Sequence, residues 1–512
     1  MDRYDIVVVG SGIAGLSAAL KASSFARVAL LTKSDLSDAN TTYAQGGLAA
    51  ALSNDDNIEL HFHDTLRAGD GLCNGEAVRI LAEHAPQEIQ WLMQNKVRFD
   101  KQNGQLLLSR EAVHSRPRIV HYKDCTGKEI EESLISQVKK NKSIDVFEDH
   151  FVIHLLTKNN RCYGAAVLDL KKNTVKHFIS AYTILATGGA GLVYTHTTNP
   201  PVATGDGVAL AYRAQAKIQD MEFFQFHPTA LFNSHPTFLI SETLRGEGGL
   251  LNNKFGKTYM EKYHRDGQLA PRDVVAKFSV IEMKKTKSKC VFLDISHKDS
   301  AYIKRRFPTI YKECLTYGID ITKQLIPVTP VAHYMIGGIK TDLNGHTSIG
   351  HLYAIGEVSC NGLHGADRLA SNSLPEGLVF GTRTVESIKK QLHKNISITF
   401  PSQFDYTVNN NVHPDIQKLK ATIQKIMWDN VGIIRTISGL KTALHQLQSI
   451  EKDSSKIVRS GINKEILELR NLVMTALLIT KSALQRKESR GTHFLQDFPK
   501  RNDNVWKQHT II

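Results

Sequence analysis

The sequence contains little cysteine, and its six cysteines show no pattern that would hold a metal ion or a set of disulfides. None forms a C-x-x-C pair, and none stands in a cluster with histidines. Because zinc sites and disulfide-rich domains need such spacing, we expect neither, and we predict a reducing, cytoplasmic environment. The cysteines are Cys73, Cys125, Cys162, Cys290, Cys314 and Cys360.

Long apolar runs are also missing. No stretch approaches the length of a membrane span, and residues 1–4 lead directly into a strand pattern without the apolar core of a signal segment. We therefore expect no membrane partner.

An excess of acidic residues is absent as well, since 64 Lys and Arg face 50 Asp and Glu, for a net charge of +14. A basic chain can bind nucleic acid. Here the basic residues are scattered, and the densest run, Lys284–Lys289, is typical of a solvated helix end. We expect no nucleic-acid partner, although an RNA-binding or RNA-modifying protein stays open as an alternative. The length of 512 residues predicts two or three globular domains.

The clearest feature present is a glycine pattern directly after an apolar strand. Residues 5–9 read Asp-Ile-Val-Val-Val, and Gly10, Gly12 and Gly15 follow with the spacing G-x-G-x-x-G. Gly10 permits a sharp turn, Gly12 lets backbone N–H groups approach a phosphate, and Gly15 lets the next helix pack close to the strand. An isolated pattern can be a turn that binds nothing, but its place after a strand favours a dinucleotide site. The residues of that site would be Gly10, Ser11, Gly12, Ile13, Ala14 and Gly15.

The second strand, residues 27–32, indicates which dinucleotide fits. It ends at Lys33, where a nicotinamide-binding fold usually has an acidic residue for the ribose. This departure disfavours NAD and leaves room for a flavin dinucleotide. A later strand at 350–357 ends at Glu357, which we expect near the flavin ribose. Ser373 and Leu374 begin a helix whose N–H groups can bind the flavin ring.

The remaining chain divides into regions of different pattern. Thr126–Glu129 predicts a capping box that opens a helix to about Lys140. Between residues 223 and 335, aromatic residues, histidines and charged loops replace the alternation of strands and helices, which predicts an inserted domain. Amphipathic patterns at 414–429, 433–449 and 464–486 predict a helical bundle.

Five motifs follow one another in a fixed order, and through them the chain resembles the succinate dehydrogenase and fumarate reductase flavoprotein family. Within that family it is most similar to the members that oxidise aspartate, and the likeness extends over nearly the whole chain. The motifs are Gln225–Thr229, Ser241–Gly249, Ala270–Ala276, Ala332–Ile339 and Asp367–Leu374.

This resemblance implies an α/β fold, in which a Rossmann-like FAD-binding domain carries an inserted α+β capping domain and a C-terminal helical bundle. The FAD-binding domain would comprise residues 1–222 and 337–398, the capping domain 223–336 and the helical domain 399–512.

The resemblance also implies an activity, the FAD-dependent oxidation of L-aspartate to iminosuccinate, with oxygen or fumarate as the electron acceptor. The product would feed quinolinate and NAD synthesis, with a hand-off to quinolinate synthase as an expected partner step. A soluble fumarate reductase or succinate dehydrogenase flavoprotein is the alternative. The oligomeric state stays open.

For the cofactor, the resemblance implies non-covalent FAD. Relatives with a covalent flavin carry a histidine where this chain has Asn40. The resemblance adds Lys33 and Asp206 to the cofactor set, together with a loop rich in small and polar residues that can lie against a planar ring. That loop contains Asn40, Thr41, Thr42, Tyr43, Ala44, Gln45, Gly46 and Gly47.

A dicarboxylate substrate needs fixed cationic or hydrogen-bonding groups at both ends. Within the motifs, Arg368 suits a carboxylate because its planar fork can bind both oxygens, and His227, Ser241 and His333 can serve the rest. Arg272 matches the family's proton-transferring arginine, with Glu242 as its expected exchange partner. Electrostatic clamping by Arg272 alone is the alternative.

Glu111 lies in the loop that reaches the substrate in aspartate-oxidising relatives, so we predict that it binds the substrate ammonium group. The alternative is a salt bridge to Arg110, Arg116 or Arg118, which lie close in sequence. Two departures from the family pattern stand out. Ala112–Val113 replaces a frequent pair of glycines, and Ser241 replaces a frequent threonine while keeping the hydroxyl.

Overall fold

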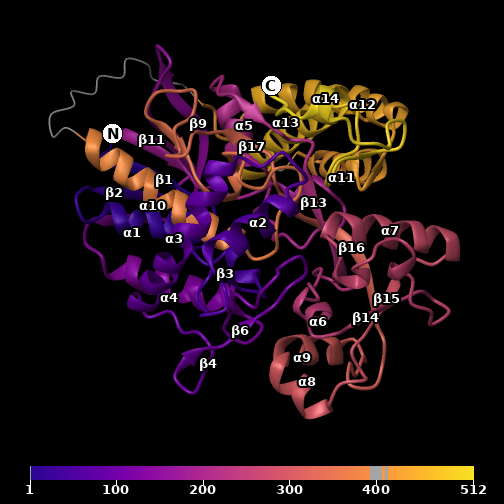
Figure 1. Ribbon diagram of the computed structural model, residues 1–512. Helices are drawn as coiled ribbons and strands as arrows, with labels where there is room; N and C mark the ends of the chain where they lie inside the picture. The colour runs from indigo at the N-terminus through magenta and orange to yellow at the C-terminus, as the bar shows by residue number, and fades with distance from the viewer. Residues whose placement is uncertain (1, 393–405, 410–412) are drawn as a thin grey trace.

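The computed structural model describes residues 2–392, 406–409 and 413–512, and its centre is a seven-stranded sheet (Figure 1). Neighbouring strands follow the order β8–β2–β1–β11–β10–β9, and β18 also pairs with β11. All pairs are parallel except those that join β10 to β11 and to β9. The sheet therefore has the α/β character that the sequence predicts. The bounds are β1 (Asp2–Val9), β2 (Val28–Leu31), β8 (Ile144–Phe147), β9 (His150–Lys158), β10 (Arg161–Asp169), β11 (Thr174–Leu185) and β18 (Leu352–Ala354).

The turn between β1 and α1 (Ile13–Ala22) is closely packed. Gly10 adopts a φ of 112°, and a Cβ there would lie 2.2 Å from the Ala186 carbonyl oxygen. A Cβ at Gly15 would lie 1.9 Å from the Gly10 carbonyl oxygen. The glycine pattern thus provides the close packing of helix on strand that we predicted from it.

Helices cover both faces of the sheet. Alternate residues of β1 enter two different cores, because successive side chains of a strand point to opposite faces. One face packs against α1 and three further helices, and the other packs against α5 and the C-terminal helices. Burial on both faces explains the continuous apolar run of β1. The bounds are α3 (Gly75–Gln94), α4 (Thr126–Lys140), α5 (Asp206–Arg213) and α10 (Ser373–Gln391).

The range of α4 agrees with the prediction, but the predicted capping box is wrong. The N-cap is Cys125, without a side-chain cap. The Thr126 hydroxyl instead donates to the Gly46 carbonyl oxygen at 2.6 Å, and Glu129 binds the guanidinium of Arg98. Both side chains therefore serve tertiary contacts that the local pattern does not reveal.

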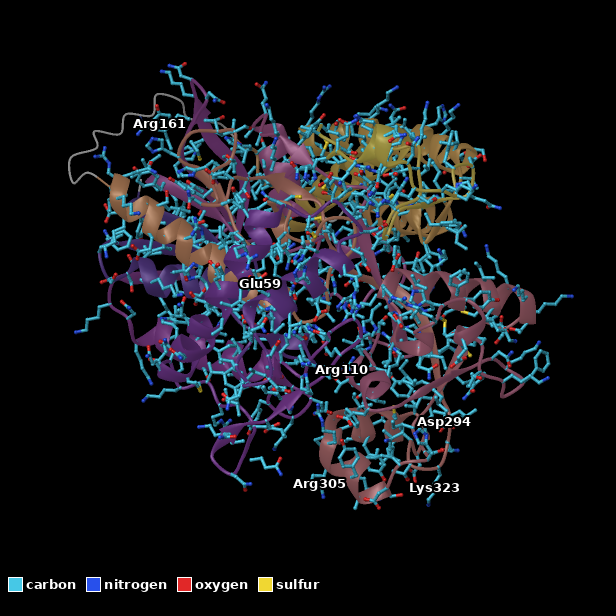
Figure 2. All side chains as sticks on the ribbon, in the orientation of Figure 1. Glu59, Arg110, Arg161, Asp294, Arg305 and Lys323 are labelled. Atoms are coloured by element: carbon cyan, nitrogen blue, oxygen red, sulfur yellow. The ribbon has the colours of Figure 1, made fainter. Side chains whose placement is uncertain are left out.

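Residues 224–335 contain a second, antiparallel sheet in the order β13–β16–β15–β14. It has a hydrophobic core of its own, and this part lies at the lower right of Figure 1. Arg305 and Lys323 lie at its outer end (Figure 2). The lysines of the run 284–289 are exposed, as expected for a solvated helix end. The elements are β13 (Phe224–Leu231), α6 (Thr243–Gly246), β14 (Leu250–Asn252), α7 (Arg272–Thr286), β15 (Val291–Asp294), α8 (Ser300–Arg306), α9 (Pro308–Thr316) and β16 (Ile326–Met335).

The three predicted C-terminal helices are present and pack against one another at the upper right of Figure 1. They share a core with the central sheet, and α13 is buried along most of its length. The predicted domain boundary at 398/399 lies outside the described residues. The helices are α11 (Ile416–Val431), α12 (Ile437–Arg459), α13 (Lys464–Gln485) and the short α14 (Asp503–Trp506).

Among the described residues, no helix is long and apolar enough to cross a membrane. All six cysteines are free, and the described part of the chain holds no cluster of residues suited to a metal ion.

The close contact at Gly15 gives a test of the β1–α1 junction. Gly15→Ala should lower the free energy of unfolding by about 1–3 kcal/mol, because helix or turn must shift to admit the methyl group. Gly75→Ala is the matched control, since nothing lies within 4 Å of a Cβ at that helical position. Urea unfolding of both variants checks this, and equal stability would contradict the packing argument.

Candidate active site

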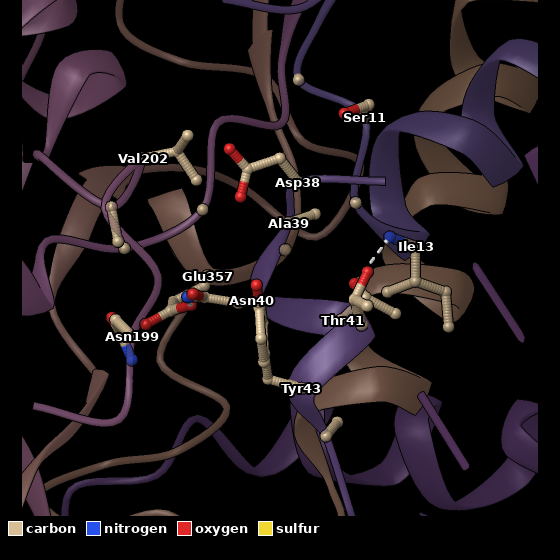
Figure 3. Close-up of a pocket in the computed structure, with 18 of the residues that line it drawn as sticks. Ser11, Ile13, Asp38, Ala39, Asn40, Thr41, Tyr43, Asn199, Val202 and Glu357 are labelled. Carbon is tan, nitrogen blue, oxygen red and sulfur yellow. Dashed lines mark hydrogen bonds between the residues drawn. The ribbon is translucent and has the colours of Figure 1, made fainter. Parts of the chain in front are cut away.

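A cavity of about 390 Å³ lies at the carboxyl ends of β1, β2 and β11, where ligands bind in open α/β sheets (Figure 3). Its wall continues along residues 198–206 to His333 and Tyr334 of β16 and to Arg368. The cavity therefore connects the glycine turn with the inserted segment. Of the predicted cofactor residues, its wall contains Gly10, Ser11, Gly12, Ile13, Ala14, Lys33, Asn40, Thr41, Thr42, Tyr43, Ala44, Gln45, Asp206, Glu357, Ser373 and Leu374.

Three predicted cofactor residues do not line the cavity. Gly15 packs against the turn, as described above. A Cβ at Gly46 would lie 2.9 Å from Oε1 of Glu111, and one at Gly47 would lie 2.2 Å from the Val120 carbonyl oxygen. These glycines permit close packing behind the wall.

The glycine end of the cavity is built to receive an anion. The N-cap of α1 is Gly12, which offers no side chain, and the positive end of the helix dipole favours negative charge there. Thr41 Oγ1 accepts a hydrogen bond from the Ile13 N–H at 3.0 Å, which joins the loop at 40–45 to the helix start (Figure 3).

Lys33 adds a fixed positive charge to the same wall. Its Nζ lies 2.7 Å from Oδ2 of Asp206 and 3.1 Å from Oε1 of Glu468 in α13. Burial opposes the charged ammonium, but the two carboxylates outweigh this effect and raise the pKa of Lys33. Lys420 of α11 binds the other oxygen of Glu468 at 2.9 Å. The C-terminal helices thus support a residue of the cavity wall through Glu468.

Near the middle of the cavity, Asn40 and Glu357 face each other (Figure 3). Asn40 Nδ2 donates to Glu357 Oε2 at 3.1 Å, and the Met335 N–H donates to Oε1 at 2.9 Å. Burial raises the pKa of Glu357 to about 7. Among the described residues, the side-chain oxygens of Asn40, Gln45 and Thr187 are buried without a hydrogen-bond partner. Polar atoms that line a cavity in this state are ready to bind a polar ligand.

Arg368 stands at the far end of the cavity with no carboxylate ion pair within the described chain. Its guanidinium donates to Gln225 Oε1 at 3.0 Å and to Ser373 Oγ at 3.2 Å, and it lies over the Tyr334 ring. Its Nε–H has no partner. Burial and the nearby charge of Arg272 lower the pKa of Arg368 to about 10. This site therefore holds a buried cation that lacks an anion.

His227 and His333 meet beside this arginine, with ring centroids 5.1 Å apart. The Thr229 N–H donates to His227 Nδ1 at 3.2 Å, so Nε2 carries the proton of the neutral ring, and Nε2 is buried without a partner. His333 Nδ1 lies 2.8 Å from the Thr198 hydroxyl. Burial, together with neighbouring arginines, lowers the pKa of both histidines well below the usual value.

Arg272 forms an ion pair with Glu242 and is linked to Arg368 through a shared acceptor. Both guanidinium groups donate to Oε1 of Gln225, each at 3.0 Å. Burial opposes ionisation of Glu242, but Arg272 and Arg245 outweigh it and hold its pKa below the usual value. Arg272 and Glu242 are thus held as charged partners behind the cavity wall.

Ser241 is used locally. Its hydroxyl lies 3.0 Å from that of Thr243 and accepts from the Thr243 N–H at 3.3 Å. Five predicted residues do not line the cavity: Ser241, Glu242, Arg272, His227 and Glu111. The ring of His227 contacts His333 in the cavity wall, and Arg272 shares the acceptor Gln225 with Arg368, which also lies in the wall.

Glu111 is buried in the loop after β6 (Leu108–Ser109). Its Oε2 accepts from the Ser371 hydroxyl at 2.6 Å and its Oε1 from the Thr243 hydroxyl at 3.4 Å. Burial, and then the nearby charge of Glu242, raise the pKa of Glu111. The alternative of a salt bridge to a neighbouring arginine is wrong, because Arg110, Arg116 and Arg118 bind other acceptors.

The same loop has an unusual backbone. Val113 adopts a φ of 71°, in the left-handed region that favours glycine. Relatives with a glycine pair here would avoid this strain, so the departure noted in the sequence has a structural cost. Arg110 lies where the loop faces the inserted segment (Figure 2), and a Cβ at Gly246 of α6 would approach its carbonyl oxygen to 2.5 Å.

The structure adds residues to the site to which we had given no role. Gln225 orients two arginines, Ser371 holds Glu111, and Thr198 holds His333. Gln225 and Ser371 lie inside the recognised motifs, so motif membership was the available signal. Thr198 lies outside every motif, and nothing in the sequence marked it.

Comparison with known proteins agrees with this geometry. The FAD binding domain family matches residues 5–374, and the fumarate reductase flavoprotein C-terminal family matches residues 420–512. L-aspartate oxidase of Pseudomonas aeruginosa is 41% identical over 97% of this chain and 96% of its own length. The chloroplastic L-aspartate oxidase of Oryza sativa is 43% identical over 99% of this chain and 84% of its own. The chain belongs to the L-aspartate oxidase family.

Solved flavoprotein structures also share the fold of this L-aspartate oxidase family member. The FrdA chain of E. coli quinol fumarate reductase superposes with a TM-score of 0.92 at 30% identity, over 100% of this chain and 94% of that one. Mycobacterium smegmatis Sdh1 gives a TM-score of 0.84 at 31% identity, over 100% and 92%. The family resemblance expected from the motifs is confirmed.

FAD is the cofactor of this family member, and the cavity fits it. The turn at Gly10–Gly12 and the α1 N-terminus suit the diphosphate, and the unpartnered oxygens near Asn40 can accept hydrogen bonds from a polar ligand. The predicted contacts of Lys33 and Glu357 with the cofactor stay predictions.

The residue at position 40 gives a prediction about attachment. Asn40 offers no imidazole for a covalent bond, and its amide is already bound to Glu357. FAD should therefore be released completely when the holoenzyme is precipitated with acid. Flavin absorbance in supernatant and washed pellet measures this, and flavin that stays with the pellet would contradict it.

Proposed function

We propose that this chain binds FAD and oxidises L-aspartate to iminosuccinate, with oxygen or fumarate accepting the electrons. The product serves quinolinate and hence NAD synthesis. The family membership and the cofactor support the activity.

The observation that carries this proposal is a pair of buried hydrogen-bond donors without acceptors. Arg368 Nε and His227 Nε2 are both unpartnered, and Arg368 has no carboxylate ion pair among the described residues. Burying a charge without a counter-ion costs roughly several kcal/mol of free energy. A substrate carboxylate supplies the missing acceptor and the missing charge in one step.

The ammonium group of the substrate is assigned to Glu111. Aspartate differs from succinate by an ammonium group on the carbon that loses hydrogen. Burial leaves Glu111 with a raised pKa, and an ammonium ion at its side would stabilise the ionised carboxylate. His333, held by Thr198, completes the binding groups.

Arg272 and Glu242 are assigned to the proton. The ion pair gives Arg272 a fixed orientation, and Glu242 offers an acceptor for a proton that passes through the arginine. Gln225 keeps Arg272 and Arg368 in register. Bound FAD would accept the hydride from the substrate α-carbon, and the chain's role is to hold that carbon still and to exclude water.

Two finer points stay proposals. We propose that the product passes to quinolinate synthase, because an imine in water is short-lived and a nearby consuming enzyme would protect it. Cytoplasmic location stays a prediction from the sequence.

Anaerobic mixing of the holoenzyme with L-aspartate, D-aspartate or succinate tests the activity. L-aspartate should bleach the flavin absorbance quickly, and the other two should bleach it slowly. Faster bleaching by succinate would support the alternative, a soluble succinate dehydrogenase or fumarate reductase.

The role of Glu111 has a selective test. Glu111→Gln should lower kcat/KM for L-aspartate by about 10- to 100-fold, since a buried charged hydrogen bond is worth roughly 1.5–3 kcal/mol. Fumarate reduction by the reduced enzyme should change little, because fumarate has no ammonium group. Stopped-flow reduction and reoxidation measure the two rates.

Parallel loss of both activities would show that Glu111 only stabilises its loop. Thr243→Val is the matched control, because it removes a weaker contact to the same carboxylate at 3.4 Å. It should affect both substrates slightly and equally.

A further inference from the structure

Two segments that carry predicted substrate residues are joined by a pair of hydrogen bonds. Glu111 belongs to the loop at 110–114, and Arg368 begins the segment at 368–373. The Ser371 hydroxyl donates to Glu111 Oε2 at 2.6 Å, and His114 Nε2 lies 3.0 Å from the Ala370 carbonyl oxygen. Glu111 and His114 of the first segment therefore bind the adjacent residues Ser371 and Ala370 of the second.

The contacts of His114 determine which ring nitrogen carries its proton. Arg118 Nη1 lies 3.2 Å from His114 Nδ1, and a guanidinium can only donate. Nδ1 is thus the acceptor, and Nε2–H donates to the Ala370 carbonyl oxygen. Burial, and then the charge of Arg118, lower the pKa of His114 to about 3, so the ring stays neutral.

Arg118 is itself rigidly held. It is fully buried, with Nη2 2.8 Å from Asp56 and Nη1 2.6 Å from Asp64 of α2 (Ile58–Ala68). Asp64 also accepts from the N–H and the hydroxyl of Ser115, both at 2.7 Å. The imidazole is therefore oriented from a helix of the FAD-binding part.

Backbone strain on both segments shows that they need such support. Val113 has a φ of 71° and Ser371 a φ of 61°, and each is next to a residue of the contact. Non-glycine residues stay in the left-handed region only where their surroundings hold them there. The bond between His114 and the Ala370 carbonyl oxygen is one of the contacts that hold both segments.

We propose that His114 is a positioning residue for substrate, which fixes Glu111 relative to Arg368 through its bond to the Ala370 carbonyl. The proposal rests on the proposed function, because that function assigns the substrate ammonium group to Glu111 and a substrate carboxylate to Arg368. His114 does not line the cavity.

Two substitutions separate the two bonds of the ring. In His114→Gln, the side-chain amide reaches as far as Nε2 and can still donate to Ala370. In His114→Asn, the amide oxygen replaces Nδ1 as the acceptor for Arg118, and the bond to Ala370 is lost. We expect His114→Asn to raise KM for L-aspartate about tenfold, the effect of one buried hydrogen bond, with kcat changed less. His114→Gln should restore most of the affinity.

The FAD dissociation constant of the holoenzyme and its unfolding midpoint provide the structural readouts, and neither should differ between the two variants. His121→Asn is the control, because this buried histidine binds Asp100 and contacts neither segment. Equal losses in His114→Gln and His114→Asn, or a parallel fall in FAD affinity, would overturn the proposal.

Equilibrium binding of succinate, followed by the change in flavin absorbance, separates this proposal from the function on which it rests. If the wild-type enzyme does not oxidise aspartate but succinate binding weakens in His114→Asn and recovers in His114→Gln, the function fails and the positioning role stands. If the wild type oxidises aspartate and both variants behave alike, the positioning role fails.

Discussion

A buried guanidinium without a carboxylate is the constraint on which this site depends. Arg368 lies in the protein interior, where burial and then the charge of Arg272 oppose its ionisation, and its guanidinium donates to the neutral acceptors Gln225 and Ser373. Removing such a charge from water costs roughly several kcal/mol of free energy. Other buried arginines of this chain recover that cost through ion pairs with carboxylates. Here the recovery is left to the ligand. Under the proposed function, a substrate carboxylate would supply the acceptor that Arg368 Nε lacks.

The surrounding structure keeps this unfavourable arrangement from relaxing. Gln225 binds Arg272 and Arg368 with the same oxygen, so neither guanidinium can move without losing a shared acceptor. Glu242 neutralises Arg272 but forms no ion pair with Arg368 within the described chain. The backbone at Val113 and Ser371 is strained as well, and the surrounding fold holds both segments in place.

The sequence was sufficient wherever a pattern is local. The turn after β1, the ranges of α4 and the C-terminal helices, and the presence of an inserted region all follow from spacing and periodicity. Side-chain partners could not be predicted in this way. Thr126 and Glu129 have the pattern of a capping box, yet tertiary contacts with Gly46 and Arg98 use both side chains. Local propensity lost there to contacts made far along the chain.

The same reason explains why some partners of the predicted site residues could not be assigned from the sequence. Lys33 was recognised beside the cofactor, but Glu468, which binds it at 3.1 Å, is 435 residues away in a helix that periodicity identifies only as part of a bundle. That contact also links the helical bundle to the wall of the cavity. If α13 moved away, Lys33 would keep Asp206 and lose one of two carboxylates that maintain its charge in a buried wall. The C-terminal helices therefore help to fix Lys33 in the wall of the cavity, although they do not line the cavity themselves.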